Sequence, residues 1–349
     1  MRPVLQVVQP GLSTTIQDLG RIGSQRLGIP VSGALDATAL RGANVLVGNP
    51  QGTGALEMAV LGPQLLVEAD SVRVALAGGA GRLVVESEDG RRREVPALTS
   101  VRAVRGDTIK IGAVAGSAVA YLAVEGGFDI APFLGSVSTY VRGGFGGLDG
   151  RALAAGDALP LRLGEVEARG EVQLRNLDLA PAVTVRVVLG PQDDYFTADA
   201  IEAFLSSEYV LTRDADRMGL RFEGALLAHS KGYNIVSDGI APGSIQVPGS
   251  GQPIVLLADR QTTGGYPKIA TVISIDLPAL GRLTPGAKVR FEGVTIDVAQ
   301  AARREFEAMM AGLPGRLEAV RPDGPDLDRL YDSNLISGVT DASAACPGA

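Results

Sequence analysis

Short apolar runs rich in β-branched residues recur along the chain, bounded by Gly, Pro or polar residues. They cover residues 72–77, 117–124, 183–189, 254–258, 271–275 and 288–291. Runs of this length and composition are typical of buried strands. Gly accounts for 46 of 349 residues, about twice its usual share, which indicates many tight turns between short strands. The sequence therefore predicts a mainly β protein.

Only three segments have the pattern of a helix. Residues 36–47 begin at the capping residue Asp36 and end before Gly48-Asn49-Pro50. Residues 197–205 have Thr197 as a cap, and residues 297–310 stop before Gly312 and Pro314. A few short helices are therefore expected among the strands.

Chain length and an internal similarity together predict two domains. A chain of 349 residues is long for a single core. Residues 119–164 and 254–293 share an order of features: an apolar strand, an acid (Glu125 or Asp259), a Gly-Gly pair, a Gly-Arg-Leu-Gly turn pattern and a second strand. Chance similarity of turns is the alternative to two copies of one β unit. We expect two small β barrels, over residues 1–180 and 181–320, and a poorly ordered tail over residues 321–349.

Composition and charge exclude several classes of protein. A net charge of −7 and a pI near 5.0 argue against a nucleic-acid binder, which needs a basic face. No apolar stretch reaches the length of a membrane span, and the first residues do not form a signal peptide. The single cysteine, Cys346, excludes an internal disulfide framework. We expect a cytoplasmic protein without a metal-ligand cluster.

A dense polar loop lies between two of the expected strands, in residues 253–276. It carries Asp259, Arg260, Gln261, Thr262, Thr263, Tyr266 and Lys268 around Gly264-Gly265. Rigid strands that present such a loop are a common way to build a binding site. A solvated hairpin is the alternative, and the pattern alone does not separate the two.

A second candidate site lies near the N-terminus. Gly11–Arg21 leads to Ser32-Gly-Ala-Leu-Asp36 and the first expected helix. A helix start with Ser, Gly and backbone N–H groups suits an anion. Asp36 has a structural interpretation, as a plain N-cap, and a catalytic one, and the two roles can coexist.

Other signals carry no chemistry. Residues 77–81, Ala-Gly-Gly-Ala-Gly, follow a strand as a dinucleotide loop would, but no helix follows, so a hairpin turn is predicted. No P-loop pattern occurs. The single histidine, His229, cannot form a metal site alone, and we expect it in a loop or at the surface.

A series of motifs occurs in order along residues 3–315. They are Thr14-Thr15-x-Gln17-Asp18-x-Gly20-Arg21, Ser32-Gly-Ala-Leu-Asp36, Asn44-x-Leu-Val-Gly-Asn-Pro50, Ala55-Leu-Glu57, Ser138-Thr139, Gly144-x-x-Gly147, Asp216-Arg-Met-Gly219, Gly243-Ser-Ile-Gln246-Val-Pro and the loop of residues 259–268. The series closely resembles the biotin-dependent carboxyltransferase subunit family. Its members include the C subunit of 5-oxoprolinase (also called KipA), allophanate hydrolase subunit 2 and the matching part of urea carboxylase.

The resemblance implies two cyclophilin-like β barrels and an assembly of several different chains. It implies a partner of the KipI type (the B subunit of 5-oxoprolinase) and a third protein of the A-subunit type. Together these open the lactam of 5-oxo-L-proline to L-glutamate at the expense of ATP. The catalytic residues expected on this basis are Lys268, Gln261 and Asp36. The expected substrate-binding residues are Ser32, Gln246, Arg260, Thr262, Gly264, Tyr266, Ser138 and Thr139. Lys268 and Arg260 are suited to a developing oxyanion, and Gln261 and Gln246 to an amide or carboxylate.

Two other functions remain open within the same family. A carboxyltransferase of a urea or amide carboxylase would need biotin, which a partner would have to supply because no Ala-Met-Lys-Met occurs here. A KipA-type regulator would bind a kinase inhibitor without catalysis. One departure is visible: the family usually has Ser-Arg-Ser-Thr where this chain has Ser136-Val137-Ser138-Thr139. Either the specificity differs, or Arg142 compensates.

Overall fold

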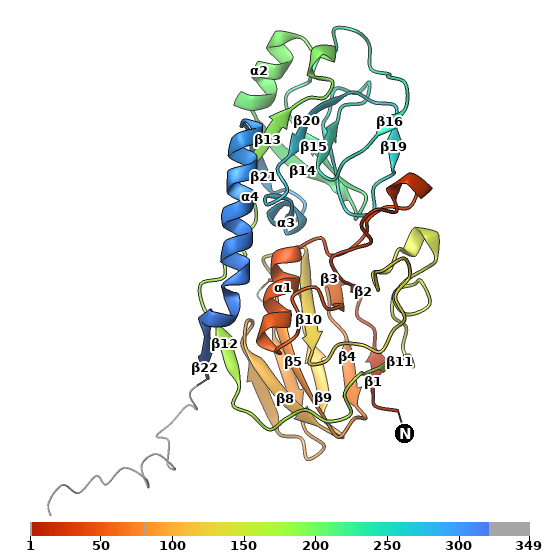
Figure 1. The fold of residues 1–349 in the computed structure, drawn as a ribbon, viewed down its shortest axis with the longest axis vertical. Coiled ribbons are helices and arrows are strands. Elements are labelled where there is room, and N and C mark those ends of the chain that lie inside the picture. Colours follow the sequence, from red (N-terminus) through yellow and green to blue (C-terminus); the bar gives the residue numbers. More distant parts are fainter. Residues whose placement is uncertain (1, 80, 321–349) are drawn as a thin grey trace, which may run out of the picture.

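Two β units stacked along the long axis make up the protein (Figure 1). The computed structural model describes residues 2–79 and 81–320. The predicted tail, residues 321–349, lies outside the described residues. None of the helices in the described part of the chain combines the length and apolar character that crossing a bilayer requires.

The first unit consists of two sheets that face each other over one core. The six-stranded sheet runs in the order β11 (Ala158–Pro160), β1 (Val4–Gln9), β4 (Gln64–Val67), β9 (Thr108–Ile111), β6 (Leu83–Glu86) and β7 (Arg92–Val95). The five-stranded sheet runs β2 (Ser13–Gln17), β3 (Ala55–Ala59), β10 (Val119–Val124), β5 (Ser71–Ala77) and β8 (Ser100–Val104). Alternate side chains of both sheets, from Leu5 to Leu161, fill the space between them.

The second unit is a closed seven-stranded barrel with its own core, from Ala182 to Phe291. Its order is β13 (Thr184–Leu189), β20 (Lys268–Val272), β17 (Ser244–Gln246), β18 (Ile254–Leu256), β15 (Gly219–Glu223), β14 (Glu208–Ala215) and β21 (Lys288–Gly293). A two-stranded sheet of β16 (Asp238–Gly239) and β19 (Thr263–Gly264) lies beside it. The predicted mainly β architecture is confirmed, although only the second unit closes as one continuous barrel.

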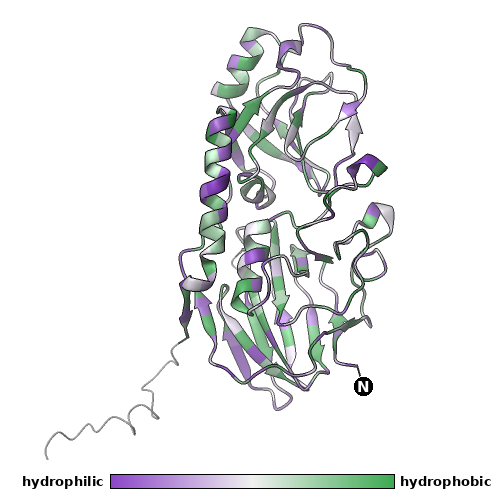
Figure 2. Cartoon of the chain, in the orientation of Figure 1, coloured by the Kyte–Doolittle hydropathy of each residue, from purple (hydrophilic) through white to green (hydrophobic). Residues whose placement is uncertain are grey.

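The helices cover the units and join them. They are α1 (Ala37–Leu46), α2 (Ala198–Ser206), α3 (Leu277–Gly281) and α4 (Ile296–Ala311), with short 3-10 turns η1 (Gln25–Leu27), η2 (Val141–Gly143), η3 (Asp193–Tyr195) and η4 (Leu313–Arg316). Three were predicted, with the caps Asp36 and Thr197 confirmed. The five-residue α3 was missed because a single turn has no measurable periodicity. Figure 2 shows apolar residues along the strands and many polar residues on α4.

Helix α4 carries the chain from the second unit back to the first (Figure 1). At its end, Met310 and Leu313 pack with residues of α1, β5 and β10 in a third apolar cluster. The next strand, β22 (Leu317–Ala319), pairs with β12 (Val172–Leu174). We retain the boundary near residue 180 as a proposal, since it falls between Leu177 of this cluster and Ala182 of the barrel core.

The two similar segments, residues 119–164 and 254–293, each place an acid against an arginine. The acid after β10, Glu125, donates its N–H to the carbonyl of Arg73 and pairs with that guanidinium at 2.6 Å. The acid after β18, Asp259, does the same with Arg217, at 2.8 Å. In both units, therefore, the acid after the strand bonds an arginine through its backbone and its side chain, although Arg73 lies within β5 and Arg217 lies between β14 and β15.

The turn glycines of the similarity also correspond. Gly156 precedes β11 with φ 89°, and Gly286 precedes β21 with φ 90°. Gly156 donates to the carbonyl of Val7 and Gly286 to that of Leu211, both at 2.8 Å. Both backbones lie in the left-handed region that favours glycine.

Two sequence interpretations of connections are corrected. The strands on either side of residues 78–82, β5 and β6, belong to different sheets, so the predicted hairpin turn is wrong. Alternation of apolar and polar residues identifies each of the two strands, but it does not show whether they pair with each other. The polar loop of residues 257–267 is not a hairpin either, because β17 lies between β18 and β20.

Matched glycine substitutions test the correspondence of the two turns. Gly156→Ala and Gly286→Ala should each lower the free energy of unfolding by about 1 kcal/mol, because neither new Cβ meets an atom within 4 Å and only the positive φ is costly. Gly315→Ala, equally unhindered but without a positive φ, should be neutral or slightly stabilising. Urea unfolding measures all three, and a cost at only one turn would contradict the correspondence.

Candidate functional site

The buried pair of Asp36 and Arg282 joins the two units. Asp36 is fully buried at the start of α1, where its Oδ1 accepts the N–H of Ala39 at 3.0 Å. Arg282, after α3, donates to both carboxylate oxygens, at 2.6 and 3.0 Å, and to the carbonyl of Ala180. The capping interpretation of Asp36 is confirmed, and its catalytic role stays a prediction.

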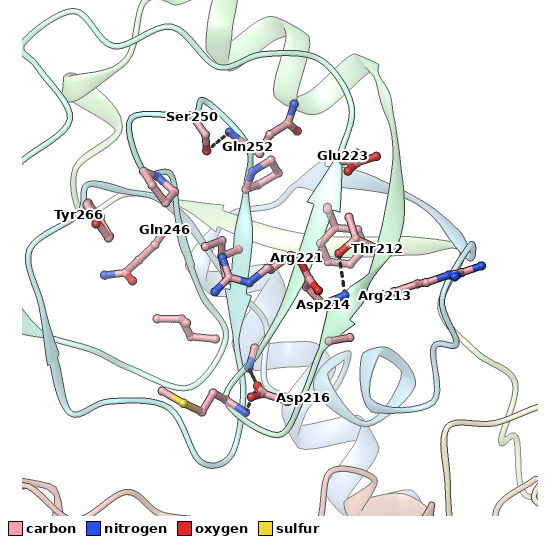
Figure 3. A pocket seen from close by; sticks show the side chains of 18 of the residues that line it. Thr212, Arg213, Asp214, Asp216, Arg221, Glu223, Gln246, Ser250, Gln252 and Tyr266 are labelled. Carbon is pink, nitrogen blue, oxygen red and sulfur yellow. Dashed lines mark hydrogen bonds between the residues drawn. The ribbon is translucent and has the colours of Figure 1, made fainter. Parts of the chain in front are cut away.

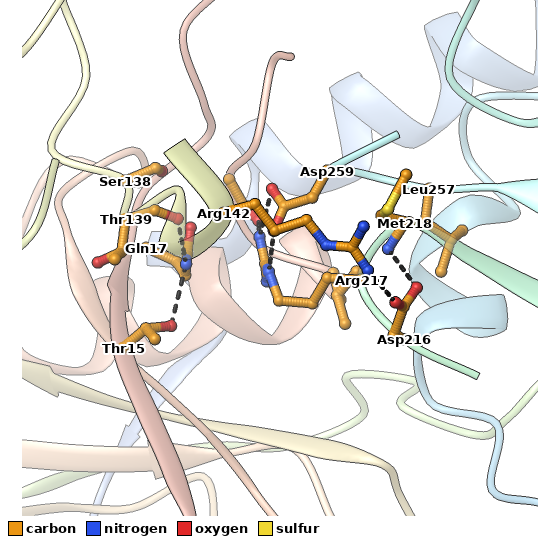
Figure 4. Close-up of polar contacts among 12 residues, drawn as sticks. Thr15, Gln17, Ser138, Thr139, Arg142, Asp216, Arg217, Met218, Leu257 and Asp259 are labelled. Carbon is orange, nitrogen blue, oxygen red and sulfur yellow. Dashed lines mark hydrogen bonds and ion pairs between the residues drawn. The ribbon is translucent and has the colours of Figure 1, made fainter. Parts of the chain in front are cut away.

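Arg217 makes a second junction between the units. It binds Glu57 of β3 and the carbonyl of Gly33 in the first unit, and Asp259 at 2.8 Å in the second. Burial would lower the pKa of Arg217, but the Glu57 and Asp259 carboxylates outweigh it and raise that pKa. Figure 4 shows Arg217 reaching Asp259. The guanidinium is therefore permanently charged and fixed.

Tyr121 connects the two junctions. Its hydroxyl donates to Oε2 of Glu57 at 2.5 Å and accepts the N–H of Asp36 at 2.8 Å. Burial first, and then the Glu57 charge, raise the pKa of Tyr121 well above its ordinary value. The phenol stays protonated and donates, so Asp36, Tyr121, Glu57 and Arg217 form one continuous polar network.

Loops at the edge of the junction carry Val137, which stands in place of the family's usual arginine, and Arg142. Val137 is half-buried and packs on the first core, with its Cγ2 against Gly54. Arg142 in η2 instead reaches across to Asp216 of the second unit, at 3.0 Å, and both side chains are more than half exposed (Figure 4). Arg142 therefore supplies a positive charge at the junction that Val137 does not.

Ser138 and Thr139 lie in this region but are fully engaged by the protein. Ser138 Oγ donates to Asp18 at 2.6 Å, and Thr139 Oγ1 donates to the carbonyl of Ile16 at 3.0 Å. Both are buried. They tie their loop to β2 (Figure 4), and their predicted substrate contact stays a prediction.

A cavity of about 920 Å³ lies on the outer face of the barrel. Its walls come from β14, β15 and β18, the segment of residues 246–253, and Arg142 of the first unit. Figure 3 shows Tyr266 and Gln246 on one side and Thr212, Asp214 and Glu223 on the other. The structure thus brings together three predicted site residues, Gln246, Gln261 and Tyr266.

An oriented amide lies in the wall of this cavity. Gln261 Nε2 donates to Oε1 of Gln246 at 3.2 Å, which fixes the direction of the Gln246 amide. The Nε2 of Gln246 is buried and has no hydrogen-bond partner among the described residues. It lies beside Gly264, where a Cβ would come within 2.6 Å of it, so Gly264 leaves room for this amide. A buried donor without a partner is rare and points to a ligand or an ordered water.

Lys268 lies opposite Gln246 in the pairing of β17 with β20. Its side chain is buried, and its Nζ donates to Asp238 at 2.8 Å and to the carbonyl of Gly239 at 3.4 Å. The hydrogen bond from Lys268 lowers the pKa of Asp238, so this carboxylate is ionised at neutral pH. An ammonium has three N–H donors, and one remains for a further acceptor.

The remaining predicted residues, Ser32, Arg260 and Thr262, lie towards the first unit. Ser32 and Arg260 line a separate cavity of about 120 Å³. The carbonyl of Thr262 accepts the N–H of Ile240 at 3.0 Å. The predicted residues therefore divide between the barrel groove, the β17–β20 pairing beside it, where Lys268 lies, and the junction.

Sequence reasoning missed Arg217, Glu57, Tyr121 and Asp238 as parts of the site. Arg217 and Glu57 belong to the motifs Asp216-Arg-Met-Gly219 and Ala55-Leu-Glu57 of the ordered series. Membership of these motifs was the sequence signal that could have identified them as site residues. Tyr121 and Asp238 carried no signal, because their partners are 64 and 30 residues away in sequence. Among residues 2–79 and 81–320, no three His, Cys, Asp or Glu side chains gather as metal ligands would.

Comparison with known proteins agrees with this architecture. A family model described as carboxyltransferase domain, subdomain A and B, matches residues 27–293. The C subunit of 5-oxoprolinase from Escherichia coli (strain K12) is 36% identical over 319 residues, or 90% of this chain and 99% of that protein. Urea amidolyase of Saccharomyces cerevisiae is 29% identical over 341 residues, or 90% of this chain and 18% of that protein.

Solved structures give the same result. The K. lactis urea amidolyase matches with a TM-score of 0.80 and 26% identity, over 94% of this chain and 22% of that one. The protein TTHA0988 matches with a TM-score of 0.73 and 37% identity, over 83% of this chain and 55% of that one. The chain thus spans about half of TTHA0988 and about a fifth of the urea amidolyase.

The protein is therefore of the class of two-unit β proteins. Its units are joined by buried ion pairs, and the second unit carries a polar groove. Within that class, the chain belongs to the carboxyltransferase domain family, subdomain A and B. The resemblance inferred from the ordered motifs is confirmed.

Removal of Asp36 tests its structural role. Asp36→Ala should lower the free energy of unfolding by about 3–5 kcal/mol, because it leaves Arg282 buried without its counter-charge and α1 without its cap. Urea unfolding measures the loss. Glu305→Ala, an exposed acid on α4, serves as the control and should change stability by less than about 0.5 kcal/mol. Equal effects of the two substitutions would contradict this role.

Proposed function

We propose that the chain is a subunit of an ATP-dependent 5-oxoprolinase, which converts 5-oxo-L-proline to L-glutamate. The identity to the C subunit of 5-oxoprolinase over 99% of that protein supports this proposal. The chain acts in the cytoplasm with a KipI-type protein (the B subunit) and a third protein of the A-subunit type, and it is inactive alone. ATP is a co-substrate of the assembly.

The reaction demands activation of a poor electrophile. A lactam carbonyl resists water because its nitrogen donates electrons into it, so the oxygen must be phosphorylated or otherwise polarised. One water opens the ring by breaking the C–N bond, and its protons go to the new carboxyl and amino groups. A second water is consumed as ATP becomes ADP and phosphate. Donors aimed at the developing oxyanion are the expected contribution of the protein.

The amide of Gln246 carries this assignment, because Gln261 orients it and its Nε2 has no hydrogen-bond partner within residues 2–79 and 81–320. Its N–H donors, with the remaining N–H of Lys268, act on the lactam oxygen. Gln261 holds the amide in place, and Tyr266, 41% exposed at the groove, packs on the ring. Asp36 acts through α1 and Arg282 rather than on the substrate, because both its oxygens are already bound.

A lysine substitution tests the site. Lys268→Met should lower ATP-dependent glutamate release by the complete enzyme by about 100- to 1,000-fold, the usual cost of losing an oxyanion donor. Lys288→Met, which removes an exposed lysine paired with Glu208, is the matched control and should retain activity. Complex formation and thermal unfolding are measured in parallel. Full activity of a folded Lys268→Met assembly would refute the assigned site.

A biotin-linked amide carboxylase is the second candidate function. The carboxyltransferase family model and the urea amidolyase relatives favour it. In that case a separate protein supplies carboxybiotin to the groove of Gln246 and Gln261. Avidin added to the assembly distinguishes the two: inhibition indicates the carboxylase, and avidin-resistant glutamate release indicates the oxoprolinase. A stable complex with neither activity would indicate a KipA-type regulator.

A further inference from the structure

A small cavity lies at the junction of the two units, apart from the barrel groove. It holds about 120 Å³. The first unit contributes Val31, Ser32, Ala34 and Leu35 to its wall, and the second contributes Pro242, Leu257, Ala258, Arg260 and Leu277. The two cavities share no lining residue.

Arg260 brings a buried positive charge to this cavity. It is 1% exposed, and three of its five N–H groups donate to neutral acceptors, the carbonyls of Ile240 and Leu257 and Oε1 of Gln25. No carboxylate in residues 2–79 and 81–320 pairs with it, in contrast to the buried Arg217 and Arg282. Burial lowers the pKa of Arg260 to about 10, so the group is still cationic at neutral pH. A buried cation without a counter-charge is costly, and a bound anion would offset that cost.

Ser32 adds a second donor to the same wall. It is 4% exposed, and its Oγ has no hydrogen-bond partner among the described residues. Its backbone is held at φ 54° by an N–H bond to the carbonyl of Ala258 at 3.0 Å. A non-glycine residue in this region is uncommon and costs free energy. The junction thus fixes Ser32 in the wall of the cavity.

The rest of the wall is apolar and limits the ligand. Leu35, Leu257 and Leu277 line it with Val31, Ala34, Pro242 and Ala258. Its volume is below the roughly 150 Å³ that accommodates benzene, so only a group with fewer non-hydrogen atoms than benzene fits. 5-Oxo-L-proline has more atoms than that. The ligand therefore differs from the proposed lactam substrate.

We propose that this cavity is a binding site for a short-chain monocarboxylate. The carboxylate accepts hydrogen bonds from the two remaining N–H groups of Arg260 and from the hydroxyl of Ser32, and the alkyl group packs on the leucines. Arg260 Nε holds the carbonyl of Ile240, while Lys268 holds the adjacent carbonyl of Gly239. The occupied site therefore fixes the segment that positions Lys268.

Calorimetric titration of the full chain on its own tests the proposal. Acetate, propionate and butyrate are the probes, propionamide is the uncharged control, and hexanoate is the oversized control. We expect one-to-one binding of acetate or propionate, with at least tenfold weaker binding of propionamide and hexanoate. Charge-assisted hydrogen bonds of this kind typically give such a factor. No heat from any short carboxylate at tens of millimolar would overturn the proposal.

Two variants locate the binding. Ala34→Leu fills the cavity and Ser32→Ala removes the free hydroxyl, and each should weaken propionate binding about tenfold or more. Ala299→Leu, at the separate apolar hollow beside α4, is the control and should bind as the unmodified chain does. Thermal unfolding confirms that each variant folds. Unchanged binding in both Ala34→Leu and Ser32→Ala would place the carboxylate elsewhere and refute the site.

Discussion

The pairing of buried charges between the two β units is the constraint on which the rest of the structure depends. Asp36 and Arg282, and Glu57, Arg217 and Asp259, are removed from water, so each charge needs its partner in place. Apolar packing between two β units would tolerate sliding. The charge pairs, linked by the Tyr121 hydroxyl, are satisfied in only one relative position of the two units. They therefore also hold the loops that meet at the junction.

That fixed junction gives the two cavities different character. The barrel groove is large and polar, with the exposed ion pair of Arg142 and Asp216 in its wall. The junction cavity is small and apolar, with one uncompensated guanidinium and one free hydroxyl among the described residues. Segment 238–240 lies between Lys268 on one side and Arg260 on the other. The proposed ligand site at the junction and Lys268 therefore contact one and the same segment of the chain.

Much of the fold was predictable from local pattern, and the site only partly. The strands at residues 72–77, 183–189 and 288–291 correspond to β5, β13 and β21 within one or two residues, because alternation and β-branching are local properties. Gln246, Gln261 and Tyr266 were predicted together and meet in the groove. Asp238 could not be predicted as the partner of Lys268, since nothing in sequence indicates that β16 pairs with β19 beside the barrel.

The sequence by itself determined the class of fold, the helix caps at Asp36 and Thr197, and membership of the family, because short-range propensity and ordered motifs are written along the chain. Only the tertiary structure decided which charges are paired. Glu125 and Asp259 are alike as sequence signals, as are Arg260 and Arg282. Burial and the neighbours brought by distant strands leave Arg282 neutralised by Asp36 and Arg260 without a carboxylate in the described part of the chain. Desolvation depends on what surrounds a charge in space, and a sequence does not state its surroundings.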